Sequence, residues 1–412
     1  MNDNTYNSSG ILEAFGPVTD TTRDIIKVVG VGGGGCNAVN NLYREGLDNV
    51  TFAVCNTDSK SLSDSPVPCK LMLGHTGLGA GANPSKGRED AEESINDVRK
   101  LFTDNTQMVY IVAAMGGGTG TGAGPLVASV AREKGLLTIG IVTLPFYFER
   151  RPKIIKALKG LEEMRRNVDA LLIINNQQLT NVFRSSHIRI EEAFKLADDV
   201  TANAVRGISE LVTLGGLIQT DFNDVKATMQ NGGGAIMAIG RASGEKRVQN
   251  ALLDALDSPL LYGNDISHAT RILFNVYTSK EHQLYVDETD ELDAFMDELN
   301  PNVEVIWGMA FDDTLGEDAK ITIIATGIDN SLPEITMTAD TSEAFNAIID
   351  RLYGPQGKGT VRSPKDGEEA PAEEPMVGVS VELPPVEDPA HGFLERVKTR
   401  IINALNKMVE PE

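Results

Sequence analysis

The chain contains 412 residues and carries a formal net charge of −22, from 59 acidic and 37 basic side chains. This length excludes a disulfide-stapled miniprotein and allows two or three domains, while the charge disfavours general binding to nucleic acids or anionic membranes, whose phosphates it repels. Cys36, Cys55 and Cys69 have no CxxC spacing, so we expect reduced thiols rather than a disulfide framework or a zinc site.

The first residues carry no export signal that we recognise. They lack a basic start followed by an apolar stretch, and the chain contains no run of about 18 apolar residues. We therefore expect a cytoplasmic protein. Residues 1–22 are polar, which predicts a disordered arm that cannot bury enough surface to fold.

From residue 24 onward, short apolar runs alternate with longer amphipathic stretches. The apolar runs predict strands at 25–31, 51–54, 108–115, 137–144 and 170–174. The stretches between them predict helices such as 86–102 and 153–168. This alternation is typical of an α/β domain, here 23–190, in which helices cover both faces of a parallel sheet.

A long helix is expected at 191–215, where apolar residues recur at spacings of three and four before Gly215-Gly216. A second, smaller α/β domain is expected at 216–330. Its predicted strands are 235–242, 270–277, 303–310 and 321–326, with a helical pattern at 246–256. The central helix would join the two domains.

The remaining chain changes character twice. Residues 331–354 form an extension whose structure the pattern does not predict. Residues 355–390 contain seven prolines and eight acids against three bases, which predicts a disordered acidic linker. Residues 391–412 are apolar and basic with a helical stripe, which indicates an amphipathic docking peptide.

A glycine-rich segment follows the first predicted strand. Gly30, Gly32 and Gly35 satisfy GxGxxG, and Asp58 follows the second strand where a ribose-binding acid would lie. This pattern alone allows an NAD-dependent oxidoreductase or a tight turn between strand and helix. More generally, glycine amides and a helix N-terminus bind phosphate.

A second glycine run, GGGTGTG at 116–122, lies between the predicted strand 108–115 and a helix. Five glycines in seven residues are hard to explain by packing, because glycine loses the most entropy on folding, so we expect a ligand to approach this backbone closely. The run has no lysine and GxxxxGK[ST] is absent, so threonine hydroxyls and amides would hold phosphates. A third glycine cluster at 77–84 is expected to complete one phosphate crevice.

These residues resemble the tubulin/FtsZ superfamily, and within it the FtsZ family of bacterial cell-division GTPases. GGGTGTG is the superfamily signature, and the resemblance covers about 24–328. The further matching segments are Asn56-Thr57-Asp58, GLGAGANP at 77–84, Pro145-Phe146 with Glu149, Glu192-Ala193-Phe194 with Asp198, and 221–226.

The resemblance implies a Rossmann-type GTPase domain, bound GTP or GDP, and Mg²⁺ held mainly through the phosphates rather than by protein ligands. The implied nucleotide-binding residues are Gly33, Gly34, Gly35, Cys36, Asn37, Asn56, Asp58, Ala82, Gly116, Gly117, Gly118, Thr119, Gly120, Thr121, Gly122, Glu149, Lys153, Asn176, Phe194 and Asp198. Phe194 would stack on guanine while Asn176 and Asp198 read its edge, which explains a preference for GTP over ATP. The alternative for Phe194 is an ordinary core position on the helix.

The resemblance also implies hydrolysis between two subunits. The loop 217–224 would enter the nucleotide site of the next subunit, where Asp221, Asp224 and Gln219 position the attacking water. From the residues alone, Asp221 and Asp224 are equally typical of a solvated turn that caps a helix. The family usually has Asn in place of Gln219 and Arg in place of Lys153, which puts the turnover rate in doubt.

We therefore expect a GTPase that assembles head to tail into filaments and acts at the division site as a midcell ring. Its terminal peptide would bind membrane-tethering division proteins, and direct membrane contact is an alternative only for 391–412. Three other functions remain open: a plasmid-partition or cell-shape relative, a nucleotide-binding structural protein without turnover, and the NAD-dependent oxidoreductase. Nucleic acid is not an expected partner.

Overall fold

The computed structural model describes residues 25–47, 49–177, 189–218, 220–258, 269–297 and 299–328, with residues 349, 352 and 353; at 190, 290, 291 and 294 it describes the backbone alone. The predicted arm at 1–22, the linker at 355–390, the peptide at 391–412, Gln219 and nearly all of the extension at 331–354 lie outside the described residues.

The first half of the chain forms six parallel strands in the order β3-β2-β1-β4-β5-β6, as the alternating pattern predicted. The strands are β1 (Ile26–Val31), β2 (Val50–Asn56), β3 (Cys69–Met72), β4 (Met108–Ala114), β5 (Leu137–Leu144) and β6 (Ala170–Asn175). The helices between them are α2 (Gly32–Glu45), α3 (Ser59–Asp64), α4 (Pro84–Glu93), α5 (Ile95–Lys100), α6 (Thr119–Glu133) and α7 (Arg151–Asn167), with a 3-10 turn, η1 (Tyr147–Glu149), before α7.

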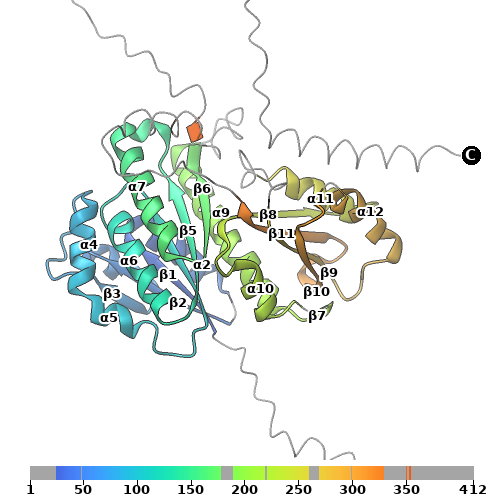
Figure 1. Cartoon of the computed structure of the whole chain (residues 1–412), viewed down its shortest axis with the longest axis horizontal. Coiled ribbons are helices and arrows are strands. Elements are labelled where there is room, and N and C mark those ends of the chain that lie inside the picture. Colours follow the sequence, from blue (N-terminus) through green and yellow to red (C-terminus); the bar gives the residue numbers. More distant parts are fainter. Residues whose placement is uncertain are drawn as a thin grey trace, which may run out of the picture.

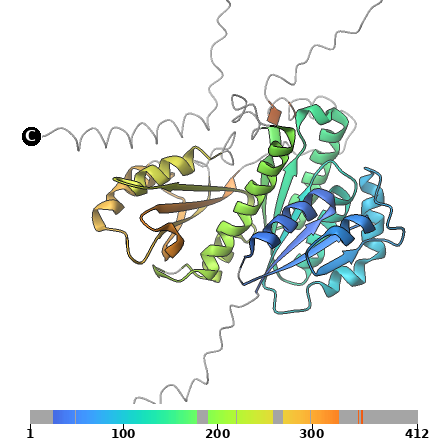
Figure 2. The ribbon, with the colours of Figure 1, turned by 180° about the vertical axis from the view of Figure 1, so that it is seen from behind.

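Helices cover both faces of this sheet, because side chains alternate along each buried strand. On β4, Met108 and Tyr110 join a core with α2 and α9 (Ile190–Thr213), while Val109 and Ile111 join a core with α4, α5, α6 and α7. Figure 1 shows α6 and α7 on the near face, and Figure 2 shows α2 and α9 from behind.

The second half of the chain follows α9. Its elements are β7 (Gly216–Ile218), α10 (Phe222–Met229), β8 (Gly233–Ala242), α11 (Arg247–Leu256), β9 (Arg271–Thr278), α12 (Val286–Met296), β10 (Glu304–Phe311), the 3-10 turn η5 (Asp313–Leu315) and β11 (Ala319–Ile328). The strand order is β8-β11-β9-β10-β7, and only β9 and β10 are parallel neighbours. This smaller α/β half, joined to the first by α9, confirms the predicted fold class.

The two halves also share one sheet. β6 pairs in parallel with β8 over Ala170–Leu172 and Gly233–Ala235, so the described strands form a continuous 11-stranded sheet. The predicted helix at 86–102 is divided at Ser94 into α4 and α5. The short strands β3 and β7 were not predicted, because each is partly or largely exposed and lacks a long apolar run.

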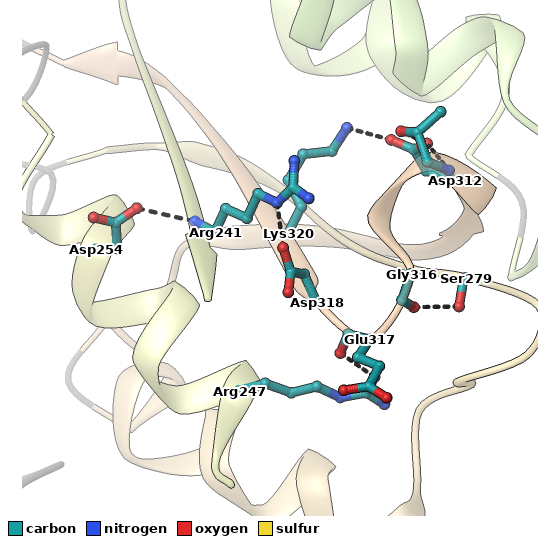
Figure 3. A network of polar contacts seen from close by, with 10 residues as sticks. Arg241, Arg247, Asp254, Ser279, Asp312, Gly316, Glu317, Asp318 and Lys320 are labelled. Carbon is teal, nitrogen blue, oxygen red and sulfur yellow. Dashed lines mark hydrogen bonds and ion pairs between the residues drawn. The ribbon is translucent and has the colours of Figure 1, made fainter. Parts of the chain in front are cut away.

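Polar side chains fix the carboxyl-terminal half of the sheet to α9. Lys320 of β11 lies 3.0 Å from Glu210 of α9 and 2.9 Å from Asp312. Close by, Arg241 pairs with Asp318 at 2.6 Å, as Figure 3 shows. Within the described ranges, no helix has both the length and the apolarity required to cross a membrane.

Candidate functional site

A cavity of about 420 Å³ lies at the carboxyl edge of the parallel sheet. Its walls come from the segments that follow β1, β4, β5 and β6, and from the amino-terminal half of α9. Open α/β sheets bind ligands at this edge. The predicted site residues that line the cavity are Gly33, Gly34, Gly35, Asn37, Gly117, Gly118, Thr119, Gly120, Glu149, Lys153, Asn176, Phe194 and Asp198.

Two helices begin at this cavity without a side-chain cap. α2 begins at Gly32 and α6 at Thr119, and no side chain accepts a hydrogen bond from their first-turn amides at the N-cap position. Among the other described helices, α3, α4 and α10 are capped by the side chains of Asp58, Asn83 and Asp221, whereas α5, α7 and α11 also lack a side-chain cap. The uncapped amides and the helix dipoles of α2 and α6 therefore form a site suited to an anion such as phosphate.

The glycines around the cavity serve two purposes. A methyl group added at Gly33 or Gly117 would meet nothing within 4 Å, so these two positions leave open space for a ligand. A methyl group at Gly120 would lie 2.6 Å from the carbonyl oxygen of Ala114, and one at Gly122 only 2.0 Å from that of Pro84. The expectation that packing cannot explain this run is therefore wrong at Gly120 and Gly122, where backbones meet directly.

The third glycine cluster lies behind the cavity and does not line it. Ala80 packs against Gly118, where an added methyl group would lie 2.8 Å from its Cβ. Lys156 Nζ donates to the carbonyl oxygen of Ala82 at 2.9 Å. The cluster at 77–84 thus supports the loop 116–122, and the expectation of three clusters lining one crevice is corrected to two.

Three other predicted residues face the interior or a neighbouring helix. Cys36 is buried with its Sγ 3.5 Å from the carbonyl oxygen of Cys55, and burial raises the pKa of its thiol to about 12. The Asp58 carboxylate accepts from the amides of Lys60 and Ser61 as the cap of α3. Asn56 is buried and accepts from the amide of Asp58 at 3.4 Å. The side chain of Asp58 is thereby held as a cap rather than offered to a ribose.

Two threonines brace the loop 116–122. Thr121 Oγ1 accepts from the amide of Gly116 at 2.8 Å, which closes the turn before α6. Thr119 Oγ1 lies 2.6 Å from Thr57 Oγ1 and lines the cavity. Of these residues, only Thr119 is placed to contact a ligand through its side chain.

Another part of the cavity wall combines a half-exposed aromatic ring with two polar side chains, Asn176 and Asp198. Phe194 is 45% exposed and packs edge to face on Phe146, with ring centroids 4.9 Å apart, so it is not an ordinary buried core residue. Asn176 is 7% exposed, and its Oδ1 has no hydrogen-bond partner among the described residues. A buried acceptor without a partner is costly, so a ligand that donates to it would be stabilised.

Asp198 lies in the same part of the cavity wall. Burial, with a smaller contribution from the charge of Asp199, raises the pKa of the Asp198 carboxyl to about 6. Phe194, Ala197, Asp198 and Thr201 all line the cavity, which is the spacing of one helix face. Raised carboxyl pKa values at a cavity are typical of binding sites.

Glu149 and Lys153 form an ion pair at the cavity wall. Glu149 Oε1 also accepts from the amide of Phe146 at 2.9 Å, so the carboxylate is held at the start of α7. Lys153 remains partly exposed and can contact a polar ligand from the side of η1.

The predicted catalytic loop lies away from this cavity. Asp221 caps α10 by accepting from the amides of Asn223 and Asp224, as the helix-cap alternative predicted. Among the described residues of 217–224, none lines the cavity. Residues from the amino-terminal half of α9 line the cavity, whereas the loop 217–224 follows the carboxyl end of α9.

The described residues contain no group of three or more His, Cys, Asp and Glu side chains that could hold a metal ion. A Mg²⁺ bound here would take most of its ligands from phosphate and water, which is usual for this ion.

Several lining residues were not predicted as site residues from the sequence, among them Thr143, Leu144, Pro145, Ala197 and Thr201. Thr143 and Leu144 end β5 and Pro145 follows it. The carboxyl ends of parallel strands share one edge, so the strand prediction contained that signal. Ala197 and Thr201 lie one helix turn from Phe194 and Asp198, and helical spacing would have found them.

Comparison with known proteins adds independent information. The Tubulin/FtsZ family GTPase domain matches residues 25–184, and the FtsZ family C-terminal domain matches residues 233–329. Cell division protein FtsZ of Porphyromonas gingivalis is 46% identical over 309 residues, which is 74% of this chain and 67% of that protein. Its namesake in Wigglesworthia glossinidia brevipalpis is 38% identical and covers 82% of this chain and 88% of its own length.

The fold is similar to that of a solved FtsZ dimer from M. jannaschii. The TM-score is 0.69 at 37% identity, over 77% of this chain and 91% of that one.

Proposed function

Because this chain belongs to the tubulin/FtsZ family, we propose that its cavity binds GTP and that a second copy of the chain completes the site for hydrolysis. The protein is a filament-forming GTPase of cell division. One observation supports the site assignment above all. The uncapped amino-terminal ends of α2 and α6 and the buried acceptor Oδ1 of Asn176 all lie at the same cavity.

The phosphates bind at the starts of α2 and α6. Amides of 33–35 and 117–120 donate to phosphate oxygens, and the open space at Gly33 and Gly117 lets the phosphates approach the backbone. When bound, Mg²⁺ neutralises phosphate charge and orients the leaving diphosphate. No basic side chain other than Lys153 lines this cavity within the described ranges, so backbone amides supply most of the attraction.

The base binds at the other end. Phe194 offers an exposed ring for stacking, while Asp198 accepts from the N1–H and 2-amino group of guanine and Asn176 Oδ1 accepts a further hydrogen bond. Adenine has no 2-amino group and its N1 is itself an acceptor, so it would leave Asp198 unpaired. Discrimination of this kind reaches several orders of magnitude in buried polar sites.

The geometry of α9 supports hydrolysis between subunits. From Asp198 to Thr213 the helix advances about 22 Å at 1.5 Å per residue, and the loop 217–224 follows that far end. The nucleotide and the acids Asp221 and Asp224 therefore belong to opposite ends of α9. Head-to-tail stacking would bring them together, and such a contact repeats without closing.

The test measures phosphate release and light scattering together, with GTP and Mg²⁺, across a range of protein concentrations. We expect both signals above the same threshold concentration and neither with ATP. GTP binding with filaments but no phosphate release would support the alternative of a structural protein without turnover. Turnover proportional to protein concentration from the lowest values would contradict completion of the site by a second copy.

The NAD-dependent oxidoreductase is disfavoured by a specific contact. Its ribose-binding acid would be Asp58, whose carboxylate accepts from two amides and the hydroxyl of Ser61 as the cap of α3. The plasmid-partition or cell-shape alternative is disfavoured by the relatives above, which are named as cell division proteins.

For the tail, we propose that residues 391–412 bind membrane-tethering division proteins and so hold the filaments at a midcell ring. The support is the apolar and basic pattern at the end of an acidic tether. Vesicle flotation of the 391–412 peptide with anionic lipid separates the alternatives. No flotation is the expected result, and flotation would instead favour direct membrane contact.

A further inference from the structure

A second cavity, of about 290 Å³, lies between α4, α6 and α7 and shares no lining residue with the nucleotide cavity. We call it the α7 groove. Its floor is made of small residues, since a methyl group at Gly160 would lie 2.4 Å from Cγ2 of Thr121, and one at Gly122 would meet the backbone of Pro84. Its rim carries the charged residues Arg88, Lys156, Lys159, Glu162, Glu163 and Arg166.

The α7 groove has an excess of positive charge in a chain whose net charge is −22. Arg88 pairs with Glu163 of the groove at 2.8 Å and with Glu92 beside it at 2.9 Å. Glu162 pairs with Arg166 of the groove at 3.0 Å and with Arg165 beside it at 3.1 Å. Lys156 donates to the neutral carbonyl oxygen of Ala82 and pairs with no carboxylate among the described residues. The groove therefore attracts an acidic ligand.

We propose that the α7 groove binds the acidic segment 366–374 of the same chain. That segment reads DGEEAPAEE, with five carboxylates and no base. It is the densest run of acids in the predicted linker, and its charge complements the surplus on Lys156 and its neighbours. The proposal concerns a surface outside the nucleotide site and does not depend on the reaction there.

The point where the linker leaves the folded body places this segment within reach. Tyr353 Oη donates to the carbonyl oxygen of Pro145 at 2.9 Å, and its ring lies 6.0 Å from that of Tyr147, which begins the turn into α7. Lys156 and Arg166 lie about 8 and 22 Å along α7 from Arg151. Residues 354–365 span up to about 40 Å when extended and about 20 Å as a flexible coil.

Tethering compensates for the weakness of exposed ion pairs. A short flexible tether supplies an effective concentration in the millimolar range, so contacts worth only a fraction of a kcal/mol each can hold the segment. The bound segment would contact Lys156, which supports Ala82, and the first turn of α6 at Thr121 and Gly122. The linker would thus lie against the back of the loops that form the nucleotide cavity.

Zero-length carbodiimide cross-linking of the full chain with GDP tests this directly, because it joins a lysine amine to a carboxylate only when they touch. An equal mixture of ¹⁵N-labelled and unlabelled chains reports whether a link lies within one molecule. We expect links from Lys156 and Lys159 to the carboxylates of 366–374, within single molecules, that disappear at high salt.

The variant Arg88→Gln/Arg166→Gln keeps both reacting lysines and removes two groove cations. Its link yield should fall about fivefold, as expected when two exposed charges no longer contribute. The matched control Arg44→Gln/Arg99→Gln removes two exposed arginines elsewhere and should leave the yield unchanged. Links spread evenly over surface lysines, links between differently labelled chains, or equal loss in both variants would overturn the proposal.

Discussion

Asp221 and Asp224 cap the same helix reciprocally. Asp221 Oδ1 accepts from the backbone amide of Asp224 at 3.0 Å, and Asp224 Oδ2 accepts from that of Asp221 at 2.9 Å. One oxygen of each carboxylate has no partner among the described residues. The capping box therefore orients two carboxylates whose other oxygens are available to a water or a partner molecule.

Asp221→Asn separates capping from catalysis. Asn caps helices about as well as Asp, so the free energy of unfolding should change by only a few tenths of a kcal/mol, whereas Asp221→Ala should lose about 1 kcal/mol. We expect phosphate release to fall about 10²-fold in Asp221→Asn, because the amide cannot accept a proton from water. Phosphate release and urea unfolding measure both effects. Unchanged turnover in Asp221→Asn would leave Asp221 with a capping role alone.

Two inactive variants should restore activity to each other if hydrolysis requires two subunits. Asp224→Asn retains the cavity, and Asp198→Asn retains the loop. In a 1:1 mixture we expect about a quarter of the wild-type rate, because half of the cavities are intact and half of those meet an intact loop. Each variant alone serves as the control. A mixture no more active than its two components would contradict hydrolysis in trans.

Nucleotide affinity should depend on pH through Asp198. Burial raises its pKa to about 6, and only the carboxylate accepts two hydrogen bonds from guanine. We expect GDP affinity to fall as the pH is lowered through about 6. Isothermal titration calorimetry measures the GDP affinity at each pH. The Asp198→Asn variant is the control, because in it only the phosphates of GDP, and not residue 198, change protonation over this range. An identical pH dependence in both proteins would exclude Asp198 as the titrating group.

The same shift predicts a change in stability without nucleotide. The folded pKa of about 6 lies above the unfolded value of about 3.9, so the unfolded chain binds fewer protons between these values. Stability is therefore lost as the pH rises from about 4 to above 6. Asp198→Asn should raise the free energy of unfolding at pH 7.5 by on the order of 1 kcal/mol, after allowance for partial exposure. A variant no more stable than the wild type at pH 7.5 would contradict this.

Only Cys69 should react rapidly with a thiol reagent in the native protein. Cys36 and Cys55 are buried while Cys69 is exposed, and burial raises the pKa of the Cys36 thiol to about 12, so little thiolate forms. Titration with an aromatic disulfide should release one equivalent quickly and the other two on denaturation. Rapid reaction of a Cys69→Ser variant would show that Cys36 or Cys55 becomes accessible.

Lys320→Met should destabilise the contact between α9 and the carboxyl-terminal half of the sheet. The side chains of Lys320, Glu210 and Asp312 are 13–18% exposed, so removal of the cation leaves two carboxylates without their shared ion-pair partner. A cost of about 3 kcal/mol is typical when one partner of a buried pair is lost. Urea unfolding measures it. The control Lys320→Met/Glu210→Gln/Asp312→Asn removes both carboxylate charges and should recover much of the lost free energy of unfolding. If it does not, the loss comes from the packing of the Lys320 side chain and not from the unpaired charges.

The sequence predicted the strands that frame the candidate nucleotide site. Apolar runs bounded by glycine-rich turns predicted the ends of β1, β4 and β5 to within one residue. This worked because both the apolar pattern of a buried strand and the residue types of a turn are visible within a few consecutive residues. Parallel strands end at one edge, so the prediction that 33–35 and 117–120 would meet followed from the strand pattern alone. Phe194 and Asp198 were named from the family resemblance, and one helix turn separates them.

Tertiary contacts decided which glycines face a ligand and which acids serve as helix caps. Gly33 and Gly117 are open to a ligand, whereas Gly120 and Gly122 touch other backbones, and no local pattern distinguishes them. Asp58 fits a ribose-binding position by spacing, yet it caps α3. The pairing of β6 with β8, which joins both halves into one sheet, has no signal in either strand.

The sequence by itself determined which elements form and which segments gather at one edge of the sheet, because periodicity and backbone freedom act over a few residues. Only the tertiary structure decided that the candidate nucleotide cavity and the acids of 221–224 belong to opposite ends of α9, and that the buried Oδ1 of Asn176 has no partner among the described residues. Those relationships depend on packing between residues that are far apart in the chain. The free-energy cost of an unpaired polar group, or of a close backbone contact, depends on which residues surround it in the folded protein, and local sequence does not specify them.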